Sequence, residues 1–319
     1  MKLLLSYFLS FVLVLFSIKQ ASASTQTIFL WETPLVNRVL INRALSNSTL
    51  LNTTLNINRE KVSQSGAISQ VIDPRMIVYT PERSNHTALL IISGGGYVRE
   101  ELAKEATSTS QYFQKQGFTV FELIYRLPNQ DGHNHFAPFA DGQRALRIIR
   151  SQANPLNYDA DKIGVLGFSA GGHLAGILAT QSNFKFYNPQ DDLDKISTRP
   201  DFAVLLYPVI NMQPPLNTTH AYKTLLGKNA NSAEQAFFSV DLQVTSNTPA
   251  TFLAHALDDP ISSVENSKKM QHALEQNDVK NKLKIFKTGG HGWGLGKQNT
   301  PTTEWPTLLL DWLKSIKML

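Results

Sequence analysis

A serine lies in the sequence Gly167-Phe168-Ser169-Ala170-Gly171, between a short apolar run and a segment with helical periodicity. The order of strand, G-x-S-x-G turn and helix is typical of a nucleophile elbow, in which a sharp turn exposes the serine hydroxyl. Small residues permit such a corner, because larger side chains would collide with the neighbouring backbone. We therefore predict that Ser169 is a nucleophile; the alternative is an idle serine in a buried glycine-rich turn.

A serine nucleophile needs a general base, and the base needs a carboxylate that fixes its tautomer. After a nucleophile elbow the expected chain order is serine, acid, histidine. His291 fits this order, because it follows the last expected strand in the glycine-rich run Gly289-Gly290-His291-Gly292-Trp293-Gly294. The other histidines are less suited to be the base. His86, His133 and His135 precede the serine, and His173 lies on its helix. His220 precedes the acid, and His255 and His272 are in positions typical of structural histidines.

Two adjacent carboxylates, Asp258 and Asp259, follow the strand that precedes the last one. Only one of them can reach the imidazole, because neighbouring side chains point in different directions. Pro260 fixes the chain directly after Asp259, as expected of a turn held in one geometry. Asp259 is therefore favoured as the acid, and Asp258 stays open as the alternative.

Backbone N–H groups must stabilise the oxyanion that forms when a serine attacks an ester carbonyl. Ala170 supplies one donor after the nucleophile, and Gly95 and Gly96 in the loop Ser93-Gly94-Gly95-Gly96-Tyr97 supply the others. The alternative, a phosphate cradle, is disfavoured because neither G-K-[ST] nor G-x-G-x-x-G follows. The sequence thus predicts an oxyanion hole made of Gly95, Gly96 and Ala170.

Two aromatic residues, Tyr97 and Trp293, flank the predicted site and are candidate substrate-binding residues; ordinary packing is the equal alternative. The run Asp131-Gly132-His133-Asn134-His135 has ligand-like spacing, but a histidine-rich loop on the substrate side is the favoured interpretation. A serine triad needs no metal, so we expect neither a metal site nor a cofactor.

Strand and helix patterns alternate from about residue 70 to the C-terminus, which predicts a mostly parallel central sheet with helices on both faces, an α/β fold. In such a sheet, chemistry belongs at the carboxyl ends of the strands. The expected strands cover residues 71–80, 87–92, 118–125, 162–166, 202–206, 251–255 and 283–287. The expected helices cover residues 102–116, 139–153, 173–180, 264–276 and 307–317, with a further helical region at 221–240.

The first 23 residues combine Lys2, an apolar run and the exit Ala21-Ser22-Ala23, a pattern typical of a secretory signal peptide. An uncleaved membrane anchor is the alternative, although the run is slightly short for a span. Residues 24–69 are polar and weakly periodic and are expected to form an N-terminal arm, whereas 70–319 form the catalytic domain. We therefore expect a periplasmic or secreted protein without stable membrane anchoring after cleavage.

The composition excludes several classes of function. The 319 residues contain no cysteine, so disulfides, a cysteine nucleophile and a thiolate metal site are all impossible. The formal charge is +5, and loss of Lys2 and Lys19 with the leader lowers it to +3. This mild balance, without basic runs interleaved with aromatics, argues against nucleic acid as a partner.

In order and spacing, these motifs resemble the acetylxylan-esterase-like or carboxylesterase branch of the α/β-hydrolase superfamily, from about Leu89 to the C-terminus. The blocks that carry the resemblance are Ser93–Tyr97, Tyr125–Leu127, Asp141–Ala145, Gly167–His173, Asp259-Pro260 with Val264–Ser267, and Gly289–Gly294. The chain departs from the pattern at Ser93, where related loops begin with histidine, and at residues 261–263, where the family tends to have Val-Val-Pro.

The resemblance implies an α/β-hydrolase fold and a triad of Ser169, Asp259 and His291. Asp259 is assigned to it because the acid precedes Val264 by five residues. It also implies hydrolysis of acetyl or other short-acyl esters, on a small-molecule or carbohydrate substrate, without metal or organic cofactor.

Three rival functions remain to be separated from a short-acyl esterase. A lipase or phospholipase would need an apolar lid, and the only candidate insertion, residues 211–240, is polar. A serine peptidase of the same fold would carry a large propeller domain for which the chain has no room. A non-catalytic binding protein on this scaffold would usually have lost Ser169 or His291.

Overall fold

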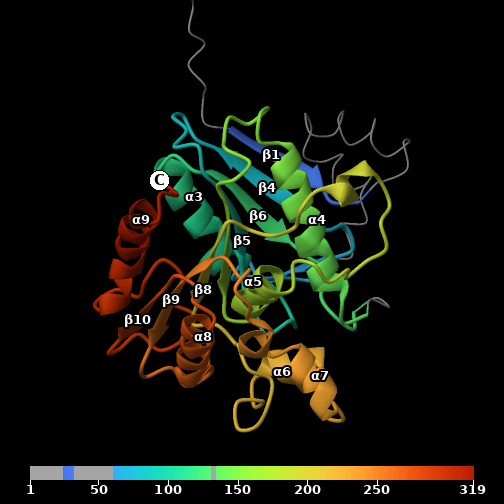
Figure 1. The fold of residues 1–319 in the computed structure, drawn as a ribbon, viewed down its shortest axis with the longest axis vertical. Helices are drawn as coiled ribbons and strands as arrows, with labels where there is room; N and C mark the ends of the chain where they lie inside the picture. Colours follow the sequence, from blue (N-terminus) through green and yellow to red (C-terminus); the bar gives the residue numbers. More distant parts are fainter. Residues whose placement is uncertain (1–23, 32–59, 131–133) are drawn as a thin grey trace, which may run out of the picture.

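The computed structural model describes residues 24–31, 60–130 and 134–319 (Figure 1). The expected signal peptide and residues 32–59 of the expected arm lie outside these ranges. Among the helices of the described chain, none is both long and apolar enough to cross a membrane.

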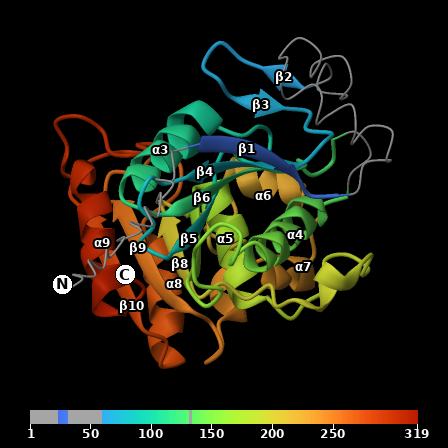
Figure 2. The same ribbon diagram turned by 90° about the horizontal axis from the view of Figure 1, so that it is seen from above.

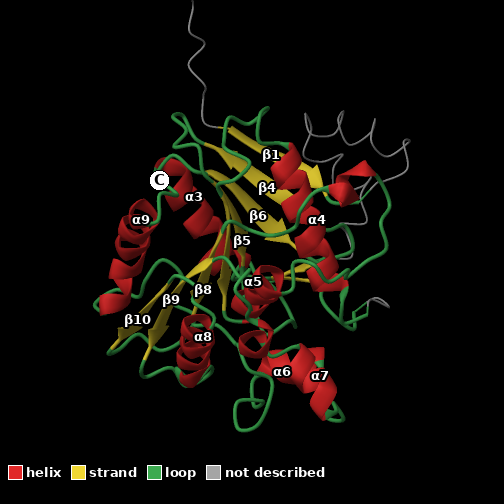
Figure 3. Cartoon of the chain, viewed as in Figure 1, coloured by secondary structure: helices red, strands yellow, loops and turns green. Residues whose placement is uncertain are grey.

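A sheet of eight strands forms the centre of the described chain, in the order β1-β4-β6-β5-β7-β8-β9-β10 (Figure 3). β4 runs antiparallel to β1 and β6, and all other neighbours pair in parallel. The strands are β1 (Ser24–Phe29), β4 (Arg75–Thr80), β5 (Ala88–Ile92), β6 (Thr119–Ile124), β7 (Ile163–Phe168), β8 (Phe202–Leu206), β9 (Ala250–Ala256) and β10 (Asn281–Phe286). Two short strands, β2 (Lys61–Val62) and β3 (Ile68–Ser69), form a separate hairpin.

Helices cover both faces of this sheet, as Figure 2 shows. The α-helices are α3 (Ser108–Lys115), α4 (Ala137–Ser151), α5 (Ala170–Thr180), α6 (His220–Leu225), α7 (Ser232–Phe237), α8 (Glu265–Gln276) and α9 (Trp305–Ser315). Shorter turns are the π-helix η2 (Leu102–Thr107) and the 3₁₀ helices η3 (Asp192–Lys195), η4 (Val240–Gln243) and η5 (Pro301–Glu304).

The central strands are buried on both faces. Successive side chains of a strand point to opposite sides of the sheet, and helices cover each side. In β5, Leu90 and Ile92 belong to the core cluster shared with α4, α5 and α8. Leu89 and Ile91 belong instead to the cluster shared with α3 and α9. The predicted mostly parallel sheet with helices on both faces is thus confirmed.

Three details differ from the expected elements. The helix expected at 102–116 begins as the π-helix η2 and continues as α3. The region at 221–240 contains two short helices, α6 and α7, with η4 after them. Residues 24–29, expected within the arm, form β1 and extend the sheet beyond β4, so this part of the arm is an edge strand.

Candidate active site

The nucleophile elbow joins β7 to α5. Ser169 adopts φ 52° and ψ −115°, a conformation that is strained for a residue with a side chain. Glycines make the corner possible: a Cβ on Gly167 would lie 2.1 Å from the Gly171 carbonyl oxygen, and one on Gly171 would lie 2.4 Å from that of Ile92. The elbow therefore places Ser169 at the carboxyl end of a central parallel strand, where the sequence pattern predicted it.

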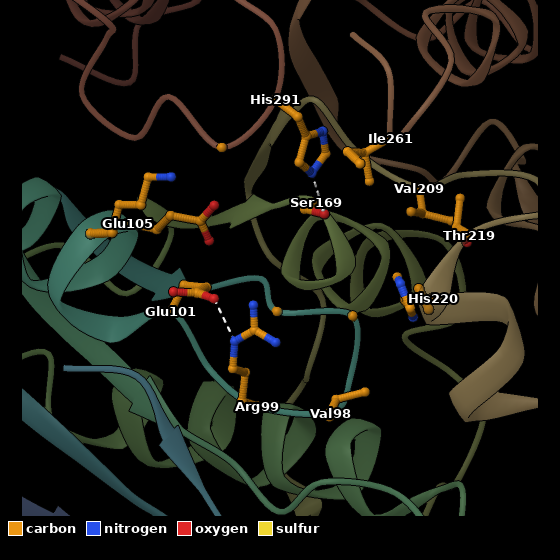
Figure 4. Close-up of a pocket in the computed structure, with 15 residues that line it drawn as sticks. Val98, Arg99, Glu101, Glu105, Ser169, Val209, Thr219, His220, Ile261 and His291 are labelled. Carbon is orange, nitrogen blue, oxygen red and sulfur yellow. Dashed lines mark hydrogen bonds and ion pairs between the residues drawn. The ribbon is translucent and has the colours of Figure 1, made fainter. Parts of the chain in front are cut away.

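A histidine from a distant loop lies beside this serine (Figure 4). Nε2 of His291 is 2.8 Å from Oγ of Ser169, and Nδ1 is 2.6 Å from Oδ2 of Asp259. A carboxylate only accepts hydrogen bonds, so Nδ1 carries the proton and Nε2 is free to accept the serine hydroxyl proton. The structure thus brings together three residues that are 122 and 32 positions apart in the chain.

Asp259 lies behind the imidazole, with its side chain fully buried. Its Oδ1 accepts hydrogen bonds from the backbone N–H groups of Ile261 and Ser262, at 2.8 and 2.9 Å. Burial alone would raise the pKa of this carboxyl, but hydrogen bonds from His255 and His291 hold the pKa well below its usual range. Asp259 is therefore a carboxylate at every pH at which an esterase would work.

A second histidine also supports this carboxylate. His255 is completely buried, and its Nε2 lies 2.8 Å from the Ser262 carbonyl oxygen and 3.2 Å from Oδ2 of Asp259. Both neighbours are acceptors, so Nε2 carries the proton and Nδ1 accepts from the Ser267 hydroxyl at 2.8 Å. His255 therefore has the structural role expected of it and also contacts the acid. Its position four residues before Asp259 is the sequence signal that could have indicated this contact.

The other carboxylate, Asp258, points away from the imidazole. Its Oδ1 accepts a hydrogen bond from the backbone N–H of Gly290 at 2.8 Å, and this bond lowers the pKa of Asp258. Asp258 therefore holds the start of the histidine loop from an exposed position.

Three backbone N–H groups lie near the serine. Gly95 and Gly96 line the same cavity as Ser169, and Ala170 is the first residue of α5, where N–H groups have no partner within the helix. In the described part of the chain, none of the three N–H groups donates a hydrogen bond to the protein backbone. They are therefore free of backbone partners on the side of the chain where the oxyanion hole is expected.

The serine opens into a cavity of about 440 Å³ (Figure 4). Its apolar walls are Val98, Val209, Ala221 and Ile261, and its polar walls include Arg99, Glu101, Lys104, Thr219 and His220. Arg99 and Glu101 form an ion pair at 2.6 Å. The cavity therefore combines apolar walls with groups that can hydrogen-bond to a polar substrate. Sequence reasoning missed these wall residues, because no motif marks them.

Neither aromatic residue predicted to contact substrate lines this cavity. Tyr97 is completely buried, and its hydroxyl is 2.8 Å from Nδ1 of His173 on α5. Trp293 is 5% exposed and packs against Tyr207 and Trp305. The prediction of substrate contacts was wrong for both residues, because both rings are buried against neighbours in the core.

His173 is a structural histidine, in agreement with its rejection as a base. Its Nε2 donates to the Phe238 carbonyl at 2.8 Å, so Nδ1 accepts from the Tyr97 hydroxyl. Burial lowers the pKa of His173 to about 4. The ring is therefore neutral at neutral pH and ties the elbow helix to the oxyanion loop.

The expected histidine-rich loop falls partly outside the described residues, since 131–133 are not among them. Within the residues that are described, no group of three histidine, aspartate or glutamate side chains is placed to hold a metal ion.

The fold and this arrangement of side chains define an α/β-hydrolase with the geometry of a serine hydrolase site. A family model described as BD-FAE matches residues 76–274. The chain therefore belongs to the BD-FAE family, and the predicted place in the α/β-hydrolase superfamily is confirmed.

Relatives of this chain include an acetylxylan esterase and a xylanase. The chain is 30% identical to an acetylxylan esterase of Xylanibacter ruminicola over 76% of its own length and 48% of the relative's. It is 36% identical to endo-1,4-beta-xylanase B of Butyrivibrio fibrisolvens over 64% of its length and 32% of the relative's. The chain thus spans about half or less of these curated relatives.

Among solved structures, the acetyl ester-xyloside bifunctional hydrolase of Caldicellulosiruptor lactoaceticus matches with a TM-score of 0.73 and 30% identity. This match covers 92% of the present chain and 97% of that one. The similarity therefore extends over nearly the whole of a solved hydrolase.

Proposed function

We propose that the protein is a serine carboxylic ester hydrolase that removes acetyl or other short acyl groups. The observation that carries this proposal is the continuous hydrogen-bond chain from Ser169 through His291 to Asp259, beside the N–H groups of Gly95, Gly96 and Ala170. Each element of acyl transfer has a residue in this arrangement: a nucleophile, a base, an orienting acid and an oxyanion hole.

The first half-reaction forms an acyl-enzyme. Oγ of Ser169 attacks the acyl carbonyl carbon while its proton passes to Nε2 of His291. The N–H groups of Gly95, Gly96 and Ala170 stabilise the resulting oxyanion, and Asp259 stabilises the imidazolium. The imidazolium then donates its Nε2 proton to the departing alkoxide, which leaves as an alcohol.

The second half-reaction regenerates the enzyme. A water molecule attacks the acyl carbon and gives a proton to Nε2 of His291, which forms a second tetrahedral oxyanion in the same place. This oxyanion collapses with release of the carboxylic acid, and the imidazolium returns the proton to Oγ of Ser169. No metal or organic cofactor enters either half-reaction.

The proposed substrate is an acetylated carbohydrate. The wall groups Arg99, Glu101, Thr219 and His220 offer donors and acceptors to sugar hydroxyls, whereas the apolar part of the cavity suits a small acyl group. The names of the acetylxylan esterase and the acetyl ester-xyloside hydrolase support the same substrate class. A small-molecule acetate ester would satisfy the same chemistry.

A series of p-nitrophenyl esters from acetate to palmitate tests the acyl preference. We expect kcat/KM to be higher for acetate than for palmitate by about 10²-fold, because a long chain would lie against Arg99, Glu101 and Lys104 and gain little from burial. Acetylated xylan, assayed for released acetate, tests the alcohol side in the same panel. A preference for palmitate would instead identify a lipase.

The expected leader supports a proposal for location. If residues 1–23 are a signal peptide, the enzyme acts in the periplasm or outside the cell, where acetylated polysaccharide is accessible. N-terminal sequencing of the mature protein tests the proposed cleavage after Ala23.

A further inference from the structure

A buried carboxylate outside the triad lies at the same cavity. Glu105 belongs to the π-helix η2, is 3% exposed, and lines the cavity together with Ser169 and His291 (Figure 4). Short π-helices are frequent at functional sites, because the extra residue changes where side chains point. The reaction described above gives Glu105 no role, so its burial requires another explanation.

Both oxygens of Glu105 accept hydrogen bonds from loops of the site. Oε2 accepts from the backbone N–H of Gly94 at 2.6 Å, and Oε1 accepts from the Tyr207 hydroxyl at 2.9 Å. The Tyr207 oxygen in turn accepts from the backbone N–H of Gly294 at 3.1 Å. Because the Gly294 N–H can only donate, the Tyr207 hydroxyl donates its own proton to Glu105. Both oxygens of Glu105 thus accept, which favours the carboxylate form.

These bonds fix the two loops that surround the reacting atoms. Gly94 precedes the oxyanion donors and packs against the nucleophile, since a Cβ on it would lie 2.8 Å from Cβ of Ser169. The Tyr207 ring lies against the His291 ring, with centroids 4.8 Å apart. The carboxylate of Glu105 therefore holds Gly94 of the oxyanion loop and Tyr207, whose ring packs against His291. Through the Tyr207 hydroxyl it also holds Gly294, three residues after His291.

The charge of Glu105 acts on the same imidazole. Burial raises the pKa of Glu105 above its usual range, and the bonds from Gly94 and Tyr207 and the attraction of His291 offset only part of that rise. The other titratable groups that face it are Glu101, on the preceding turn, and Tyr207; Lys104 is its neighbour in the cavity wall. A negative charge here stabilises the imidazolium that forms during acyl transfer.

We propose that Glu105 is a charged positioning residue that locks the oxyanion loop and the histidine loop together and stabilises the protonated form of His291. This proposal rests on the esterase function proposed above. The hydrogen bonds of Glu105 go to Gly94 and Tyr207 rather than to Ser169 or His291, so it acts on the reacting groups through these two residues and through its charge.

The substitution Glu105→Gln tests this role with little change in volume. The glutamine amide has one accepting oxygen and an NH2 group that only donates, so it cannot accept from both the Gly94 N–H and the Tyr207 hydroxyl as the carboxylate does. We expect kcat for p-nitrophenyl acetate to fall about 10- to 100-fold, less than the loss of an oxyanion donor, while KM changes less than about twofold. The acid limb of the kcat/KM profile should move to lower pH, because the imidazolium loses a nearby negative charge.

A matched control exists on β6. Glu122 is also 3% exposed, and it accepts hydrogen bonds from the Tyr79 hydroxyl at 2.9 Å and the Thr107 hydroxyl at 2.8 Å. Glu122→Gln should therefore lower the melting temperature, as the loss of a buried hydrogen bond to a carboxylate would, but leave kcat and the pH profile unchanged. If Glu105→Gln behaves like Glu122→Gln, the positioning role is refuted.

Tyr207→Phe provides a second test if Glu105→Gln does not fold. It keeps the ring against His291 but removes the hydroxyl that joins Glu105 to Gly294, so kcat should fall several-fold with KM unchanged. In the double variant the losses should not add, because both changes break one chain of bonds. If the wild type is active but the two losses add in the double variant, this proposal is wrong and the proposed function stands. The same holds if Tyr207→Phe keeps full activity. A wild type that hydrolyses no ester overturns the proposed function as well.

Discussion

Ser169→Ala is expected to lower kcat/KM for p-nitrophenyl acetate by at least about 10⁴-fold. The hydroxyl oxygen forms the bond to the acyl carbon, and it is the group hydrogen-bonded to Nε2 of His291. Without it, His291 can at most activate a water molecule, so the residual rate reflects only binding and the oxyanion hole. Initial rates with purified wild type and variant measure the effect.

The fold of this variant should be intact. Alanine at position 169 removes one hydroxyl, whose hydrogen bond is to His291, and leaves the backbone bonds of the elbow in place. The melting temperature should therefore stay the same or rise, since a strained catalytic site often costs stability. Turnover near the wild-type rate in a folded Ser169→Ala protein would refute the nucleophile.

Asp259→Asn is expected to lower kcat by about 10³- to 10⁴-fold, with a small change in KM. If the asparagine NH2 group takes the place of Oδ2, it faces Nδ1 of His291 and Nε2 of His255. Both ring nitrogens carry a proton, so donor would face donor. The imidazole would then adopt the tautomer that carries a proton on Nε2 and could not accept the proton of Ser169. Single-turnover measurements with p-nitrophenyl acetate would locate the loss in the acylation step.

The adjacent residue offers the control. Asp258→Asn removes the same charge one residue earlier, where the carboxylate contacts the Gly290 N–H and not the imidazole. We expect it to reduce kcat less than about tenfold. A larger loss in Asp258→Asn than in Asp259→Asn would reverse the assignment of the acid.

The alternation of strands and helices was predictable because the central strands are mostly apolar and helices such as α4 and α9 have one apolar face. The elbow was equally clear, since Gly167 is dictated by the Gly171 carbonyl oxygen four residues later, whereas Gly171 itself is dictated by Ile92 and Ser93 on a distant segment. The order serine, acid, histidine then identified the residues that the sheet brings together. Local rules thus predicted the parts of the site that local geometry determines.

Other features depend on contacts between distant segments and leave little trace in the sequence. β1 is too polar to read as a strand, and it forms one because the exposed edge of β4 accepts it. Tyr97 and Trp293 lie next to the predicted site in sequence, but their rings turn into the core. Glu105 lies in an ordinary helical pattern, and only the π-helix turns it toward Gly94 and Tyr207.

The most direct measurement of the central claim is the mass of the protein after reaction with a fluorophosphonate, which attacks activated serines. We expect one adduct per chain, on the peptide that contains Ser169, with loss of esterase activity in proportion to labelling. His291→Ala should label far more slowly, because the hydroxyl keeps its proton. An unlabelled protein that still hydrolyses p-nitrophenyl acetate, or an adduct on a different residue, would contradict the account.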